Sequence, residues 1–136
     1  MSIREAAVAG LFYEADPGRL KKQLSGFLSS SLAQAVARPK VLIVPHAGYV
    51  YSGSTAATAY SLLEPLRDQI RRVVLLGPAH RVYLQGMALP SVDAFATPLG
   101  EVPLERAALD AITAMPGVCV SDEAHREEHS LEVQLP

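Results

Sequence analysis

The sequence predicts an α/β domain with a three-layer α/β/α arrangement, in which helices cover both faces of a mostly parallel central sheet. Two short, wholly apolar runs, residues 41–44 (VLIV) and 73–76 (VVLL), have the composition of strands that are buried on both faces. An alanine-rich segment, residues 54–66, lies between them and has the length of a connecting helix. Together the three segments predict one right-handed strand–helix–strand unit within a single domain, residues 1–136.

A longer helix is predicted over residues 17–36. Asp16 is a suitable N-cap, Pro17 suits the first helical position, and leucine and phenylalanine then recur at spacings of three and four. A second amphipathic helix is predicted over residues 104–115, which a Pro-Gly pair follows. The other expected elements are short: strands at residues 87–89, 92–95 and 118–120, a turn at residues 97–100, and the beginning of a helix at residues 129–135.

The composition is that of a globular protein with an apolar core. Hydrophobic residues make up 49% and charged residues 19% of the chain, which excludes a wholly disordered protein. The formal net charge of -2 disfavours binding to nucleic acid or to an anionic membrane surface. We expect no signal peptide, because Arg4 and Glu5 interrupt the first apolar stretch, and no membrane span, because no apolar run approaches about 20 residues. Cys119, the single cysteine, lies between two valines, and we expect it to be a buried apolar residue of a cytoplasmic protein.

Histidines follow both apolar runs. His46 comes two residues after the first run, and His80 comes four residues after the second. Because ligands of α/β sheets bind beyond the carboxyl ends of the strands, we expect both imidazoles on the same rim. Two imidazoles there suit either a metal site or general acid–base catalysis. The alternative is that each is a loop residue with no ligand role.

A third histidine-bearing segment lies near residue 129. His129 and Glu132 are three residues apart, which places them on one face if the segment is helical. They are candidates for a ligand pair or for a base and the group that orients it. The alternative is a solvated helix start, in which Glu127 and Glu128 interact with the helix dipole. His125 is expected to be a surface residue.

Tyrosine and hydroxyl side chains surround the loop after the first run. Tyr49 and Tyr51 either present their phenolic hydroxyls to a substrate or pack over the following helix, and the sequence does not decide between these roles. Residues 52–55 (SGST) favour a helix N-cap over an anion pocket, because the chain has neither of the usual nucleotide-binding glycine motifs.

Five segments together resemble the Memo-like family, whose bacterial group is called AmmeMemoRadiSam system protein B. They are Ala9–Tyr13 (AGLFY), Pro45–Gly53 (PHAGYVYSG), Gly77–His80 (GPAH), Ser91–Gly100 (SVDAFATPLG) and Glu128–Pro136 (EHSLEVQLP). The family is similar in structure to the class III (LigB-type) extradiol dioxygenases, which use non-haem iron(II). The resemblance covers essentially the whole chain.

The resemblance implies a metal-binding pocket. His46 and His80 match two histidines of the family's pocket, and His129 matches the histidine of an EHS-[IL]-E motif near the same cavity. The implied cofactor is a divalent metal: iron, copper or zinc. Family members are roughly twice as long, and their later half supplies an aspartate/histidine pair and a cysteine to the pocket. We therefore expect this chain to be a truncated N-terminal half, or a shortened relative that completes its site with another chain.

Three hypotheses for function follow. In the first, His46 and His80 hold the metal of a dioxygenase-like oxidoreductase, while His129 and Glu132 act as acid–base or positioning groups. In the second, the same cleft binds a small molecule or peptide without turnover. In the third, the chain folds only with a missing half or with a second copy, as a homo-oligomer. The name of the bacterial group also implies a radical-SAM protein as a pathway partner.

Overall fold

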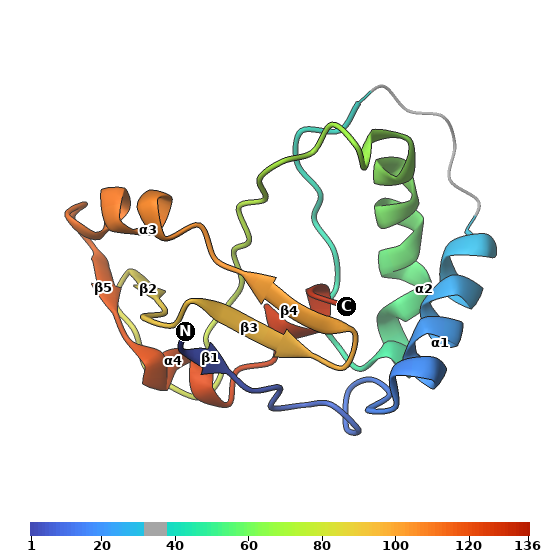
Figure 1. Ribbon diagram of the computed structural model, residues 1–136, viewed down its shortest axis with the longest axis horizontal. Coiled ribbons are helices and arrows are strands. Elements are labelled where there is room, and N and C mark those ends of the chain that lie inside the picture. Colours follow the sequence, from blue (N-terminus) through green and yellow to red (C-terminus); the bar gives the residue numbers. More distant parts are fainter. Residues whose placement is uncertain (32–37) are drawn as a thin grey trace.

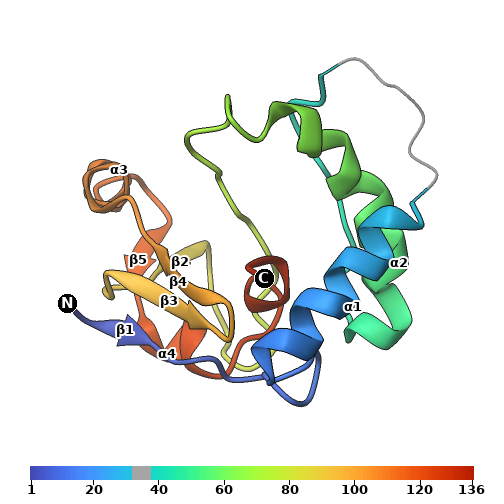
Figure 2. The ribbon, with the colours of Figure 1, turned by 45° about the vertical axis from the view of Figure 1, so that its right-hand side comes forward.

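The computed structural model describes residues 1–31 and 38–136 and has an α/β fold, as the sequence predicts (Figure 1). In chain order the elements are β1 (Ile3–Arg4), α1 (Pro17–Ser29), α2 (Tyr49–Tyr60), the 3-10 helix η1 (Ser61–Leu66), β2 (Met87–Leu89), β3 (Ala94–Thr97), β4 (Gly100–Pro103), α3 (Arg106–Thr113), β5 (Val118–Val120), α4 (Asp122–Arg126) and the 3-10 helix η2 (Glu132–Gln134). In Figure 2, α1 and α2 lie side by side, away from the short strands. No helix within the described ranges is long and apolar enough to cross a membrane.

The strands form two small sheets. β1 pairs in parallel with β3, and β3 pairs antiparallel with β4; β2 and β5 form a separate parallel pair. The strands expected at residues 87–89 and 118–120 are confirmed, whereas the strand expected at residues 92–95 begins two residues later. The predicted turn is also confirmed, because Thr97 and Gly100 face each other across a hairpin. The sequence pattern did not predict β1 and β4, which are very short.

The two apolar runs are not paired strands, which corrects the prediction for residues 41–44 and 73–76. Within the described part of the chain, neither run takes part in a strand ladder or a backbone–backbone hydrogen bond. Several of their side chains are exposed, so these runs are not buried on both faces either. The physical reason is that a strand exists only beside a partner, and composition alone does not supply one.

The α1 and α2 helices pack closely at one glycine. The predicted N-cap is confirmed, because Asp16 accepts the backbone N–H of Arg19 at 2.8 Å. α1 ends at Ser29; the predicted end of this helix falls in residues 32–37, which are outside the described residues. α2 begins five residues earlier than predicted. At Gly53 a Cβ atom would lie 2.4 Å from the ring of Phe27, so only glycine allows this helix contact.

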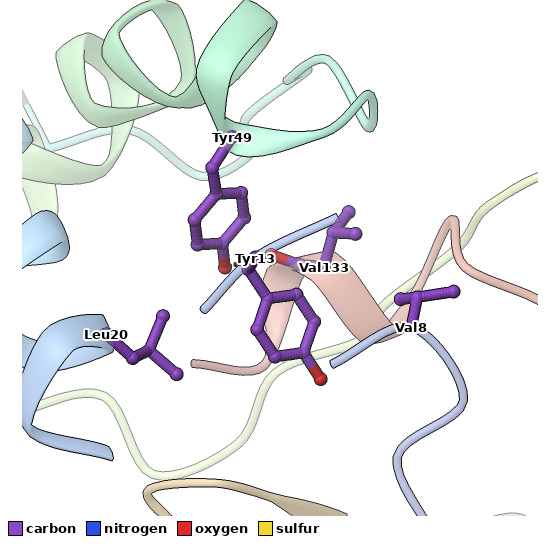
Figure 3. Close-up of a cluster of buried hydrophobic side chains, with 5 residues drawn as sticks. All are labelled: Val8, Tyr13, Leu20, Tyr49 and Val133. Atoms are coloured by element: carbon purple, nitrogen blue, oxygen red, sulfur yellow. Dashed lines mark hydrogen bonds between the residues drawn. The ribbon is translucent and has the colours of Figure 1, made fainter. Parts of the chain in front are cut away.

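The core joins the two ends of the chain. It contains Val8, Tyr13, Leu20, Tyr49 and Val133 (Figure 3). Tyr49 points from α2 toward Val133 of η2, and its hydroxyl donates to the Val133 carbonyl at 2.6 Å. The last residues of the chain are therefore packed against the first turn of α2, which holds the loop that follows residues 41–44.

Two single-residue predictions were wrong. Cys119 is exposed, because β5 lies at the surface and has one neighbouring strand among the described residues. His125 is buried rather than a surface residue. Its ring lies beside Phe95 and its Nε2 is 3.0 Å from the carbonyl of Ala88, so α4 packs against both sheets.

The helix predicted over residues 104–115 is confirmed as the shorter α3, whereas the one expected at residues 129–135 is only η2.

Candidate metal centre

Three of the four histidines gather at one place. His46, His80 and His129 each offer a ring nitrogen, and these three atoms all lie within 4.8 Å of one another. The rings of His80 and His129 are stacked, with centroids 4.5 Å apart, and the ring of His46 is 5.2 Å from that of His80. His46 and His80 therefore lie close together as expected, but not on the rim of a sheet, because the segments that precede them are not paired strands.

Glu128 holds two of these histidines in place. Its Oε1 lies 2.8 Å from Nδ1 of His80 and 3.5 Å from Nδ1 of His129. The same oxygen accepts the backbone N–H groups of His129 and Ser130, and Oε2 accepts that of His80. Glu128 entered the sequence-based expectations only in the alternative of a solvated helix start, so this role was missed. The signal that could have found it is a carboxylate directly before a candidate ligand, because metal-binding imidazoles commonly donate their second nitrogen to a carboxylate.

The electrostatics of the cluster favour an ionised Glu128 and a neutral His129. Burial raises the pKa of Glu128, but the hydrogen bonds from His80 and Ser130 outweigh burial and lower it to about 2. Burial lowers the pKa of His129, and the nearby His80 and His46 lower it further, against an opposing effect of Glu128. Imidazole binds metal only in its neutral form. The environment of His129 therefore keeps it in the form that binds metal.

The loops that carry the histidines are tied to the C-terminal segment. The Ser130 hydroxyl donates to the carbonyl of Pro78 at 2.7 Å, and the Gln134 side-chain amide donates to the carbonyl of Pro45 at 3.1 Å. At Gly77 a Cβ would lie 2.8 Å from the Ser130 hydroxyl, so the two segments approach closely. These contacts bring residues more than 45 positions apart in the sequence to one site.

Glu132, predicted as a catalytic partner of His129, lies fully buried among other groups. One carboxylate oxygen accepts the backbone N–H of Val8 and the hydroxyl of Tyr13, and the other accepts the N–H of Ala7 and pairs with Arg4. Arg4 also donates to the carbonyl oxygens of two residues in the 125–128 segment. These contacts give Glu132 a structural role: it joins the N-terminal segment to the one that carries Glu128 and His129.

The two candidate substrate-binding tyrosines lie in different environments. Tyr49 is a core residue whose hydroxyl already donates to Val133. Tyr51 is 84% exposed. Ser52 lies in the first turns of α2 rather than before the helix, and its hydroxyl donates to the Ala47 carbonyl at 3.0 Å. The predicted N-cap role of residues 52–55 is therefore wrong, because Gly48 occupies the N-cap.

The donor set fits a divalent transition metal. Three imidazoles are a common set of protein ligands in catalytic metal sites, and they leave further coordination positions for a substrate or water. The contact with Glu128 occupies Nδ1 of His80, so Nε2 is the nitrogen available for a metal. No cysteine contributes, because Cys119 lies on β5 outside the cluster.

Comparisons with known proteins agree with this arrangement of motifs. A family model described as Memo-like protein matches residues 4–136. The MEMO1 family protein of Aquifex aeolicus (strain VF5) is 41% identical over 136 residues, which cover 100% of this chain and 49% of that relative. Protein MEMO1 of Xenopus laevis is 41% identical and that of Homo sapiens 40% identical, each over 98% of this chain and 44% of the relative.

The chain therefore spans about half the length of the curated relatives it matches. The family match runs from the strand that contains Arg4 to the last residue, and it includes all three clustered histidines and Glu128. This match confirms the family that the sequence motifs predicted: the chain belongs to the Memo-like protein family.

Proposed function

We propose that the three clustered histidines bind one divalent metal ion and that this centre serves a dioxygenase-like oxidoreductase. The observation that carries the proposal is the approach of the three ring nitrogens to within 4.8 Å of one another. Three segments far apart in the sequence bring these nitrogens together, and the Glu128 carboxylate contacts two of the rings. His129 then acts as a third ligand rather than as a separate acid–base group.

The residues of this chain have distinct tasks in the proposed centre. Glu128 holds the proton on Nδ1 of His80 and so presents Nε2 as the ligand atom. Phe12 packs on the ring of His129 with centroids 4.5 Å apart, which restricts the orientation of that ring. A bound iron or copper ion would supply redox or Lewis-acid chemistry at its open positions.

Elemental analysis of the purified protein tests the metal centre. We expect nearly one equivalent of iron, copper or zinc in the wild type and a loss of most of it in His46→Ala, His80→Ala and His129→Ala. His125→Gln is the matched control, because His125 is the one remaining histidine and lies buried outside the cluster. Equal metal content in all four variants would overturn the proposal.

Oxygen uptake tests the redox part. The metal-loaded protein is expected to consume dioxygen in the presence of a catechol-like small molecule, and the His80→Ala variant is expected not to. A protein that binds metal stoichiometrically but consumes no dioxygen with any catechol-like molecule tested would argue for ligand binding without turnover.

A further inference from the structure

We infer that Arg4 is a positioning residue of the histidine cluster. Its guanidinium fixes the segment of residues 125–128, and the last side chain of this segment, Glu128, contacts two of the clustered rings. The consequence for metal binding rests on the proposed metal centre, whereas the effect on the rings also concerns the metal-free protein.

Arg4 is held on two sides at the edge of the first sheet. Its backbone lies in β1, in register with Phe95 of β3, and its guanidinium lies over the Phe95 ring, 5.2 Å from the centroid. Arg4 is only 8% exposed, and both ribbon views show β1 beside α4 (Figures 1 and 2). A planar guanidinium restricted in this way presents its N–H groups in a fixed direction.

The guanidinium contacts two carbonyl oxygens of the 125–128 segment. Nε and Nη2 donate to the carbonyl of His125 at 3.0 and 2.7 Å, and Nη2 also donates to the carbonyl of Glu128 at 2.8 Å. His125 lies in the last turn of α4, where carbonyl groups lack partners within the helix. Arg4 therefore joins the end of α4 to Glu128 and fixes the backbone between them.

The place of the Glu128 backbone determines where its carboxylate lies. The carboxylate accepts the backbone N–H groups of the two residues that follow it, which hold it within its own turn. Its contacts with the ring and the backbone N–H of His80 therefore depend on where that turn lies. Arg4 fixes the turn from one side, and the bond from the Ser130 hydroxyl to the Pro78 carbonyl fixes it from the other. Without Arg4, we expect the carboxylate to lose its contact with His80.

The ion pair with Glu132 is a separate contact of the same guanidinium. It uses Nη1, which takes no part in the bonds to the 125–128 carbonyls. A lysine ammonium can keep this charge pair, but it cannot reproduce the planar fork that reaches both carbonyls. Arg4→Lys therefore removes the positioning contacts and keeps the opposite charge, whereas Glu132→Gln removes the opposite charge and keeps the positioning contacts.

A comparison of these two variants tests the inference. Titration with cobalt(II) and a competing chelator measures metal affinity, and urea denaturation measures stability. We expect Arg4→Lys to weaken cobalt binding about tenfold, the lower end of the usual cost of disturbing the groups that orient a ligand. Glu132→Gln is the matched control: it is expected to lose more stability, because a buried charge stays unpaired, and yet to bind cobalt as the wild type does. Cobalt affinities that fall in step with stability in both variants would overturn the inference, because Arg4 would then act on folding alone.

NMR of the imidazole nitrogens gives a second test that needs no metal. Spectra of the metal-free protein are recorded at a pH at which the imidazoles are neutral. We expect the proton of His80 on Nδ1, facing Glu128, in the wild type and in Glu132→Gln, and a mixture of both tautomers in Arg4→Lys. A wild type that binds no cobalt would contradict the proposed metal centre, and this difference in tautomer would still support the role of Arg4. The same tautomer in all three proteins would overturn that role.

The double variant Arg4→Met/Glu132→Gln provides the test if Arg4→Lys does not fold. It leaves no unpaired charge between the two positions, and it also lacks the bonds to the 125–128 carbonyls. Circular dichroism checks that each variant is folded. We expect the double variant to show the weakened cobalt binding and the mixed His80 tautomers, and wild-type values of both would overturn the inference.

Discussion

Glu128 Oε1 lies 2.8 Å from Nδ1 of His80, so Nε2 is the nitrogen of His80 that is free to bind a metal. The same oxygen also accepts the backbone N–H of His129 at 2.9 Å. One carboxylate thus links two of the three clustered histidines, although it lies 48 residues from His80 in the sequence. The geometry of the cluster therefore depends on Glu128.

Glu128→Gln is expected to lower the affinity for a divalent metal about 10- to 100-fold, the usual cost of removing a carboxylate that orients a ligand. A zinc or cobalt titration with a competing chelator measures the change. Glu127→Gln is the matched control, because Glu127 is the exposed neighbour of the same residue type. Equal affinities of the two variants would show that Glu128 does not orient His80.

Glu132→Gln is expected to lower the free energy of unfolding by about 3–5 kcal/mol, because it leaves the buried guanidinium of Arg4 without its opposite charge. Urea denaturation measures the difference. In the exposed pair of Arg72 and Glu105, the same change, Glu105→Gln, should cost only about 0–1 kcal/mol. Similar values for the two variants would contradict the structural role of Glu132.

Gly53→Ala is expected to lower the free energy of unfolding by about 1–3 kcal/mol, because its Cβ would lie 2.4 Å from the ring of Phe27 and push α1 and α2 apart. Gly26→Ala makes the same change in α1, where no atom lies within 4 Å of the new Cβ. It is expected to stabilise the protein by about 0.5–1 kcal/mol through helix propensity. Thermal unfolding measures both changes in stability. Changes of opposite sign would support the close contact of α1 and α2 at Gly53, and changes of the same sign would contradict it.

Alkaline pH is expected to destabilise the protein through its buried tyrosines. Burial raises the pKa of Tyr13, and the hydrogen bond to Glu132 raises it further; burial also raises the pKa of Tyr49. A raised pKa in the folded state means that stability is fully present below the ordinary value of 10.0 and falls as the pH rises above it.

Absorbance titration of the phenolates, combined with circular dichroism, measures this effect. The Tyr13→Phe and Tyr49→Phe variants should each reduce the phenolate signal that appears only as the protein unfolds. Tyr83 is exposed, so Tyr83→Phe is the control and should not change the phenolate absorbance that appears on unfolding. Ionisation of all five tyrosines before any loss of secondary structure would be inconsistent with the buried hydroxyls.

The sequence was informative wherever a signal is local. Asp16 with Pro17 predicts the start of α1, because this signal needs only a few neighbouring residues. That residues 41–44 have no partner strand among the described residues could not be predicted, because strand pairing depends on residues far away in the sequence.

Long-range contacts also account for the errors about single side chains. Nothing beside Glu132 in the sequence indicates Arg4, which lies 128 residues away and determines its role. His125 has charged neighbours in the sequence but packs on Phe95 in space. Glu128 was missed for the same reason, since its contact with His80 exists only in the folded chain.

X-ray absorption spectroscopy of the zinc- or copper-loaded protein tests the metal centre most directly. It counts the imidazole nitrogens bound to the metal, which for zinc lie at about 2.0–2.1 Å. We expect three imidazoles in the wild type and in His125→Gln, and two in His129→Ala. A wild-type spectrum with fewer than three imidazoles, or an unchanged spectrum in His129→Ala, would contradict a metal centre built from His46, His80 and His129.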